Sequence, residues 1–170
     1  SLKAYAKAYQ EHVQLMEYTI NHRTDYILQE IYKQQPDVLC FSCYIWNFRY
    51  VQELVKDFHK LAPEVPIWVG GPEVSYESET FLIDYPMVQG VMIGEGEATF
   101  CELCRFYVEG TGSSLSADIA ARNSGNGRTE GLEVISGLVF RDDEGKCVRT
   151  SARAPLPMDE LPFCYENLQD

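Results

Sequence analysis

Three short segments of the sequence combine small residues with polar or aromatic side chains. They lie at 42–47, 70–73 and 94–97, and their candidate site residues are Ser42, Cys43, Tyr44, Trp46, Asn47, Gly70, Gly71, Pro72, Glu73, Gly94, Glu95, Gly96 and Glu97. Glycine lets a ligand approach the backbone closely. Tyr44 and Trp46 would add flat apolar surface with polar atoms at its rim. Each segment alone reads most simply as a turn, but the three together favour a binding crevice.

Other kinds of site are disfavoured by what the sequence lacks. Gly94-x-Gly96 has no third glycine, and the carboxylates of Glu95 and Glu97 would oppose a pyrophosphate, so a dinucleotide site is not expected. No Walker motif and no Gly-x-Ser-x-Gly motif occur. The three histidines are scattered, and although His22 could face a metal or cofactor, a surface loop is its expected place. No catalytic set and no metal site are predicted.

The amino-acid composition also limits the kinds of partner that this chain is expected to bind. The chain has 170 residues, of which 14 are Lys or Arg and 26 are Asp or Glu, giving a net charge of −12. Such a field repels phosphate backbones, so neither nucleic acid nor an anionic membrane is an expected partner. No apolar run approaches the length of a membrane span, and no signal peptide opens the chain, so a cytoplasmic protein is expected.

The six cysteines raise the question of a metal or redox site. They form two Cys-x-x-Cys pairs, Cys40/Cys43 and Cys101/Cys104, with Cys147 and Cys164 alone. A four-thiolate zinc site would require the two pairs to converge. Cys40 falls inside a strand expected to be buried, whereas Cys101 and Cys104 are one helical turn apart on a different element. Burial of reduced thiols is therefore expected ahead of metal or redox chemistry.

Alternating β-rich and helical runs must position the three segments. Strands are predicted at 13–19, 38–42, 67–69 and 88–93, and helices at 25–35, 51–61, 77–85 and 97–108, with Thr24 and Asn47 as candidate N-caps. The continuous apolar run 38–42 is typical of a strand buried on both faces of a parallel sheet. This order predicts right-handed βαβ units in an open, doubly wound parallel α/β sheet, where ligands bind beyond the carboxyl ends of the strands.

Three regions are expected along the chain. Residues 1–110 form the α/β domain, and 111–132, rich in Gly, Ser, Asn and Thr, form a flexible loop. Residues 133–170 carry a β-hairpin, with strands at 134–140 and 146–150 and Gly145 at a turn position needing positive φ, and then a proline-stiffened segment at 154–162. The helix-like start and the end without a capping signal indicate a piece of a longer protein.

In this order, the three segments resemble a known family. Ser42-x-Tyr44-x-Trp46-Asn47, Gly70-Gly71-Pro72-Glu73 and Gly94-Glu95-Gly96-Glu97-x-Thr99 are similar to the N-terminal cobalamin-binding domain of cobalamin-dependent radical SAM enzymes. The nearest groups are the Mg-protoporphyrin IX monomethyl ester oxidative cyclases and related methyltransferase-like proteins. The resemblance covers about residues 1–110.

The resemblance implies a flavodoxin-like, Rossmann-like domain that holds cobalamin at the carboxyl edge of its sheet. Segments 42–47 and 70–73 would line the nucleotide tail of the cofactor, and 94–99, with Thr99, a neighbouring wall. The hairpin and the segment after it would be the linker to a downstream radical SAM domain of the same polypeptide. That domain would use S-adenosylmethionine and a [4Fe-4S] cluster for methyl transfer or oxidative cyclisation.

Two features depart from the family pattern. The Asp-x-His-x-x-Gly motif of methionine-synthase-type cobalamin domains is absent, and no first strand precedes the helix-like run at Leu2. The Cys-x-x-x-Cys-x-x-Cys motif of a radical SAM barrel also does not occur, so it is expected beyond Asp170.

The sequence is also compatible with two other functions. A cofactor-free flavodoxin-like regulatory module would bring acidic residues together at a Mg²⁺ or phosphorylation site. A small enzyme would need Glu73, Glu95 or Glu97 to be buried as an acid or base.

Overall fold

The computed structural model describes residues 2–110 and 129–154. In chain order the elements are α1 (Leu2–Tyr5), the 3-10 helix η1 (Lys7–His12), α2 (Thr24–Lys33), β1 (Leu39–Ser42), α3 (Phe48–Leu61), β2 (Ile67–Gly70), α4 (Pro72–Ser75), α5 (Ser78–Asp84), β3 (Val88–Met92), α6 (Gly96–Glu109), the 3-10 helix η2 (Leu132–Val134), β4 (Leu138–Arg141) and β5 (Cys147–Arg149). The predicted flexible loop lies almost entirely outside the described residues, as does nearly all of the proline-stiffened segment.

One five-stranded sheet organises the fold, in the order β1-β2-β3-β4-β5. β1, β2 and β3 run parallel, whereas β4 pairs antiparallel with β3 and β5 antiparallel with β4. The predicted α/β sheet is therefore confirmed, with a two-stranded antiparallel extension. The predicted hairpin forms that extension, and Gly145 has the positive φ of 83° expected at its turn; its role as a linker stays a prediction.

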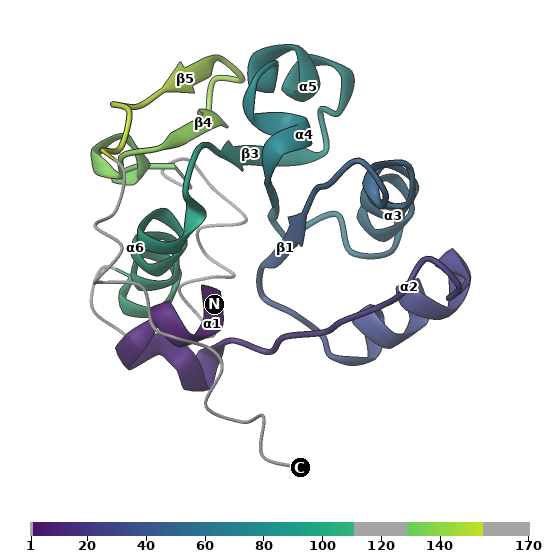
Figure 1. Cartoon of the computed structure of the whole chain (residues 1–170). Coiled ribbons are helices and arrows are strands. Elements are labelled where there is room, and N and C mark those ends of the chain that lie inside the picture. Colours follow the sequence, from purple (N-terminus) through teal and green to yellow (C-terminus); the bar gives the residue numbers. More distant parts are fainter. Residues whose placement is uncertain (1, 111–128, 155–170) are drawn as a thin grey trace.

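Two hydrophobic clusters cover the two faces of the sheet. Along β2, Ile67 and Val69 belong to one cluster and Trp68 to the other, as the alternation of a strand requires. The first cluster packs under α2, α3 and α5, and the second under α6 and the N-terminal helices. In Figure 1, α2 and α3 accordingly lie on one side of the sheet, with α6 and α1 on the other.

A glycine makes room for the largest side chain of the core. Trp68 is fully buried, and a Cβ at Gly90 of β3 would come closer than 3.0 Å to its ring. The indole Nε1–H of Trp68 donates to the hydroxyl of Tyr107 at 2.9 Å, which ties β2 to α6. The buried indole N–H therefore has a hydrogen-bond acceptor, as buried donors in native proteins usually do.

Three predictions about local structure are wrong. Segment 13–19 forms no strand, although Val13 is extended, because a strand requires a neighbour and none pairs with it in the described residues. β1 is not buried on both sides: it is the edge strand, and Cys40 and Ser42 are exposed. Thr24 is the first residue of α2 and not its N-cap, which is Arg23.

The remaining helices occur within one to three residues of their predicted bounds. The helix predicted at 25–35 ends at Lys33, and the short α4 was not predicted. Among the described residues, no helix has the length and apolar character needed to cross a bilayer.

Candidate functional site

The three predicted segments follow the carboxyl ends of the three parallel strands. Ser42 of β1 pairs in register with Gly70 of β2, and Gly70 pairs with Met92 of β3. Segments 42–47, 70–73 and 94–97 therefore leave the sheet at the same level, on the edge where open parallel sheets bind ligands. We refer to these three segments together as the carboxyl edge.

Two of these segments are in direct contact. The backbone N–H of Cys43 donates to the carbonyl of Gly70 at 2.6 Å, which continues the β1–β2 ladder by one residue. Gly71 has a φ of 112°, and a Cβ there would lie closer than 3.0 Å to the carbonyl oxygen of Cys43. Only glycine fits such a backbone conformation and such an approach. Because Cys43 is fully buried, this contact forms the floor of the edge.

The loop after β1 presents an aromatic surface. The rings of Tyr44 and Trp46 stack with centroids 4.7 Å apart and an angle of 3° between their planes. Tyr44 is 39% exposed, Trp46 63% and Ile45 78%. Flat apolar surface of this kind, held outside the core, is suited to contact with a planar ligand.

Asn47 holds this loop in place. Its Oδ1 accepts a hydrogen bond from the backbone N–H of Tyr44, and its Nδ2 donates to the carbonyl of Ser42, both at 2.8 Å. Asn47 occupies the N-cap position of α3, as predicted, but its side chain makes no capping hydrogen bond to the helix. The amide is used to close the loop that carries the aromatic pair.

The segment after β2 turns at once into α4. Pro72 is the first residue of that helix, where its missing N–H leaves no hydrogen bond unmade. The Ser75 hydroxyl donates to the carbonyl of Gly71 at 2.8 Å. Pro72 and Glu73 are exposed, so this side of the edge is open to a ligand.

The segment after β3 contains both solvent-exposed and buried residues. Gly94 has a φ of 76°, and a Cβ there would meet no atom within 4 Å. Glu95 is exposed. Gly96 is more enclosed, because a Cβ added there would lie 3.7 Å from the Leu2 side chain of α1. Thr99 is fully buried: its hydroxyl donates to the carbonyl of Ser136 and accepts from the guanidinium of Arg153. In this conformation, Thr99 joins α6 to the region around the hairpin.

The acidic residues of the edge are not enclosed. Glu73 and Glu95 are exposed and Glu97 is half-buried, so none has the burial that an acid–base catalyst would need. No group of three or more His, Cys, Asp or Glu side chains in the described residues is arranged to hold a metal ion. The acidic cluster required by a regulatory Mg²⁺ site is therefore not found in that part of the chain.

The cysteine pairs do not form one thiolate cluster. Cys40 is exposed on the edge strand, contrary to prediction, while Cys43 is buried and Cys101 and Cys104 are half-buried on α6. Burial raises the pKa of the Cys43 thiol to about 12 and that of Cys104 to about 12. Neutral thiols of this kind are poor nucleophiles and poor metal ligands. Cys164 lies outside the described residues.

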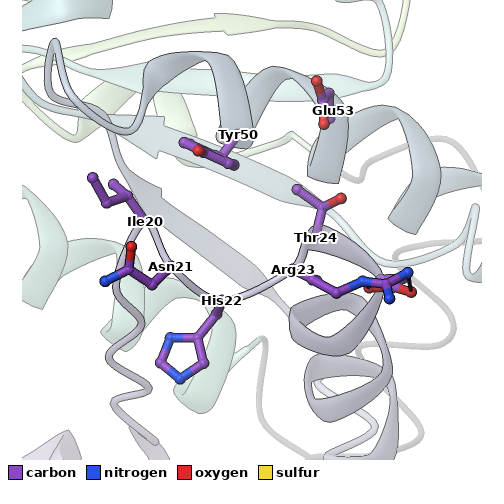
Figure 2. Close-up of a pocket in the computed structure, with 8 residues that line it drawn as sticks. Ile20, Asn21, His22, Arg23, Thr24, Tyr50 and Glu53 are labelled. Carbon is purple, nitrogen blue, oxygen red and sulfur yellow. Dashed lines mark hydrogen bonds and ion pairs between the residues drawn. The ribbon is translucent and has the colours of Figure 1, made fainter.

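An open pocket of about 520 Å³ lies beside the first turns of α3, and it was not predicted from the sequence. Figure 2 shows it between the segment that enters α2 and two residues of α3. Its lining is mostly polar and consists of Ile20, Asn21, His22, Arg23, Thr24, Asp25, Tyr50 and Glu53. No periodic pattern in the sequence links these two parts of the chain, because the pocket depends on how α2 and α3 pack together.

His22 lines this pocket, but its side chain is not placed to act as a ligand there. In Figure 2 its ring is turned away from Tyr50 and Glu53. Nδ1 of His22 accepts the backbone N–H of Thr19 at 3.0 Å, and the ring stacks on Tyr26 with centroids 5.8 Å apart. His22 is exposed in a surface loop, which was its expected place.

Comparison with known proteins gives one family. Residues 1–104 match the model of the B12 binding domain family, which is well over half of the chain. The cobalamin-dependent radical SAM methyltransferase TokK of Streptomyces tokunonensis is 41% identical over 69 residues. A 2-(S-pantetheinyl)-carbapenam-3-carboxylate methyltransferase of Streptantibioticus cattleyicolor is 44% identical over 71 residues. These matches cover 41% and 40% of this chain but only 10% of each relative.

A solved structure has the same fold. The cobalamin-dependent S-adenosylmethionine radical enzyme OxsB, with aqua-cobalamin and S-adenosylmethionine bound, superposes with a TM-score of 0.63 at 18% identity. The superposition covers 91% of this chain and 20% of OxsB. The present chain is thus similar to a small part of a much longer enzyme.

Proposed function

We propose that this chain, which belongs to the B12 binding domain family, holds cobalamin at the carboxyl edge of β1, β2 and β3. The observation that carries this placement is the stacked, exposed pair of Tyr44 and Trp46, fixed by Asn47 at the end of β1. A corrin ring and a benzimidazole base both favour flat apolar walls and closely approaching backbone, not a basic pocket.

The residues of the edge suit such a ligand in polarity. Ser42, Cys43, Tyr44, Trp46 and Asn47 would form one wall, Gly70, Gly71, Pro72 and Glu73 the floor, and Gly94, Glu95, Gly96, Glu97 and Thr99 the neighbouring wall. The open space at Gly94 and the exposure of Ser42 support an approach of the ligand to the main chain. Thr99 would act indirectly, because its hydroxyl is already bonded to Ser136 and Arg153.

The wider activity belongs to a longer polypeptide. Cobalamin, when bound, supplies a cobalt centre that can carry a methyl group. Both curated relatives are named as methyltransferases, which supports methyl transfer ahead of oxidative cyclisation. The chain would bind and orient the cofactor toward a radical SAM domain of the same polypeptide that uses S-adenosylmethionine and a [4Fe-4S] cluster. No group of three or more His, Cys, Asp or Glu side chains in the described residues could hold a metal ion, so the [4Fe-4S] cluster would be held outside them.

Two glycines provide a matched test of the placement. Gly94 (φ 76°) and Gly145 (φ 83°) both have left-handed backbones and open space where a Cβ would stand, but only Gly94 lies at the carboxyl edge. Gly94→Ala and Gly145→Ala should therefore cost similar stability, about 1 kcal/mol each. Hydroxocobalamin and methylcobalamin are titrated into each variant and followed by visible absorption and calorimetry.

The outcomes separate the alternatives. Saturable binding that is weakened at least about tenfold by Gly94→Ala and unchanged by Gly145→Ala supports the proposed edge. Equal effects of the two variants would place the cofactor elsewhere on the chain. If neither residues 1–170 nor the longer natural polypeptide binds cobalamin, the proposal fails and the cofactor-free module is favoured.

A further inference from the structure

The residues that follow the hairpin lie at the level of the carboxyl edge. β4 is antiparallel to β3 and begins with Leu138 opposite Met92, the last residue of β3. β5 is antiparallel to β4 and therefore runs back toward the carboxyl end of β3. Directly after β5, the N–H of Thr150 donates to the carbonyl of Leu138 at 2.9 Å. Residues 150–154, which we call the exit segment, thus lie at the end of the sheet that carries the proposed cobalamin site.

Gly137 connects the exit segment to the segment after β3. Its N–H donates to the carbonyl of Ser151 and its carbonyl accepts from the N–H of Ile93, both at 2.8 Å. Gly137 has a φ of 83°, and a Cβ there would lie 2.7 Å from Oγ1 of Thr99. A side chain at this position would collide with α6. The exit segment, the residue before Gly94 and the first turn of α6 therefore meet at one glycine.

Arg153 fastens the exit segment to α6. Its Nε–H donates to Oγ1 of Thr99 at 3.1 Å, and its Nη2 donates to the carbonyl of Ser136 at 3.3 Å. The same Nη2 lies 2.9 Å from Oε2 of Glu102. The Arg153 side chain is 20% exposed, whereas the cations of the other ion pairs in the described residues are 48% exposed or more. A planar guanidinium that joins three segments in this setting constrains them more than a surface ion pair does.

The wall formed by 94–97 is anchored at both ends to the contacts around Arg153. It begins after Ile93, whose N–H is bonded to Gly137, and it ends before Thr99, whose hydroxyl is bonded to Arg153. Between these ends, a Cβ at position 94 would meet no atom within 4 Å. The open part of the wall therefore takes its position from its two anchored ends.

We propose that Arg153 is a positioning residue that holds the 94–97 wall and the exit segment in one fixed arrangement. The proposal rests on the proposed function for the identity of the ligand at this wall, but not for the arrangement itself. Through Thr99, Arg153 fixes the wall against which cobalamin would lie. Through Ser136 and Glu102, it fixes the place from which the polypeptide continues after residue 154, so that this place and the ligand keep a constant position relative to each other.

Amide hydrogen exchange in the natural polypeptide, measured without cobalamin, tests the arrangement alone. The amide of Gly137 reports on the exit segment because it donates to Ser151. The amide of Asp142 donates to Lys146 at the opposite end of the hairpin and is the internal control. Arg153→Met should reduce the protection of Gly137 at least about tenfold and leave that of Asp142 unchanged. Equal protection of Gly137 with and without the substitution overturns the proposal.

Arg141→Met is the matched control variant. Arg141 is also a half-buried arginine of the hairpin, but its guanidinium donates to the carbonyl of Leu82 near the end of α5, the helix that precedes β3. This substitution should leave the protection of Gly137 unchanged. A loss of Gly137 protection as large as that in Arg153→Met would show that any damage to the hairpin releases the exit segment, which overturns the particular role of Arg153.

Titration of the same proteins with hydroxocobalamin tests the effect on the site. Arg153→Met should weaken binding about fivefold, and Arg141→Met should not. Because Arg153 acts through Thr99, Thr99→Val should weaken binding as well, and the double variant should bind little more weakly than either single variant. A merely structural arginine would give no effect on binding, or an effect that adds fully to that of Thr99→Val, and either result overturns the positioning role.

Arg153→Lys provides a milder substitution, which serves the same tests if the methionine variant does not fold. Lysine keeps a charge beside Glu102 but lacks the planar fork that reaches both Thr99 and Ser136. Its Gly137 protection and its cobalamin affinity should therefore fall between those of the unmodified protein and Arg153→Met. Values equal to those of the unmodified protein would contradict the role of the guanidinium.

Failure of this inference and failure of the proposed function give different results. If the unmodified polypeptide does not bind cobalamin, the proposed function fails, whereas a loss of Gly137 protection in Arg153→Met still supports the fixed arrangement. If the unmodified polypeptide and Arg153→Met bind cobalamin equally well, the proposed function stands and the positioning role is overturned.

Discussion

Gly71 approaches Cys43 so closely that a side chain at position 71 would collide with the Cys43 carbonyl oxygen. The contact joins the loops that follow β1 and β2, and it is made between main-chain atoms that cannot move aside without breaking the β1–β2 pairing. The two loops therefore form one rigid floor at the carboxyl edge. The contribution of this contact to the free energy of unfolding can be measured by mutation.

Gly71→Ala should destabilise the fold by at least about 2 kcal/mol, because it adds both a strained left-handed backbone and a main-chain collision. Gly145→Ala is the control, since it has the same kind of backbone but open space around it, and about 1 kcal/mol is expected there. Urea unfolding of both variants gives the comparison. Equal losses would show that the Cys43 contact adds nothing to the strain.

Trp46→Ala should weaken cobalamin binding about tenfold while leaving the free energy of unfolding within about 0.5 kcal/mol, because the ring is exposed and stacks only on another exposed ring. Tyr32→Ala, at the far end of α2 and also about half exposed, should change neither quantity. Calorimetry and urea unfolding provide the two readouts. Unchanged affinity in Trp46→Ala would remove the aromatic pair from the proposed site.

Tyr107→Phe should destabilise the fold by about 1–3 kcal/mol, because it leaves the fully buried indole N–H of Trp68 without the hydroxyl that accepts it. Tyr32→Phe removes an exposed hydroxyl and should be neutral. Thermal or urea unfolding can be followed by tryptophan fluorescence. A neutral Tyr107→Phe would mean that water reaches the indole.

The ion pair between Glu79 of α5 and Arg149 of β5 should make stability depend on acid pH. The Arg149 guanidinium, 2.7 Å away, lowers the pKa of Glu79 from 4.5 to about 2. A lowered carboxyl pKa stabilises the folded state above the unfolded value near 4.5, and this contribution is lost as the pH falls toward 2. Both side chains are nearly half exposed, so less than about 1 kcal/mol is expected.

Arg149→Met should flatten this part of the pH–stability curve, whereas Arg49→Met should not, because Arg49 is far more exposed and its pair with Glu53 is long at 3.7 Å. NMR titration of Glu79 checks the pKa directly. A pKa near 4.5 in the unmodified chain would contradict the pairing.

The buried thiols should limit stability at alkaline pH. Burial raises the pKa of Cys43 from 9.0 to about 12. Because the folded pKa lies above the unfolded one, the stabilisation is complete below pH 9 and is lost as the pH rises toward 12. Cys43→Ala should reduce this loss, although it also removes buried volume. At pH 8, mass spectrometry should find Cys43 alkylated far more slowly in the folded chain than in urea, and equal rates would contradict its burial.

Local patterns were sufficient to predict most of the elements. The apolar stripe predicted on α3 is buried at Val51, Leu54, Val55 and Phe58, although Leu61 at its end is half exposed. Gly145 adopts positive φ at its turn. The segments after β1, β2 and β3 could be assigned to one edge because parallel strands joined by helices all end on the same side. These features depend on backbone periodicity and steric limits that neighbouring residues determine.

Other features depend on residues far apart in the chain. Asn47 could be placed at a helix start from the sequence, but only the folded loop shows that its amide binds Tyr44 and Ser42 instead of the helix. Thr99 follows the third segment in sequence, yet its hydroxyl is taken up by Ser136 and by Arg153, 54 residues away. The pocket between 20–25 and α3 similarly exists only where two helices meet.

Strand pairing shows most clearly which features are set by local sequence and which depend on the tertiary structure. The sequence by itself determined the alternation of 13–19 and the apolar character of 38–42, and so the faces that these residues present. Only the tertiary structure decided that the first segment lacks a hydrogen-bonded neighbour and that the second is an edge strand with Cys40 exposed. The physical reason is that side-chain periodicity is local, whereas the backbone hydrogen bonds of a strand are made with another part of the polypeptide.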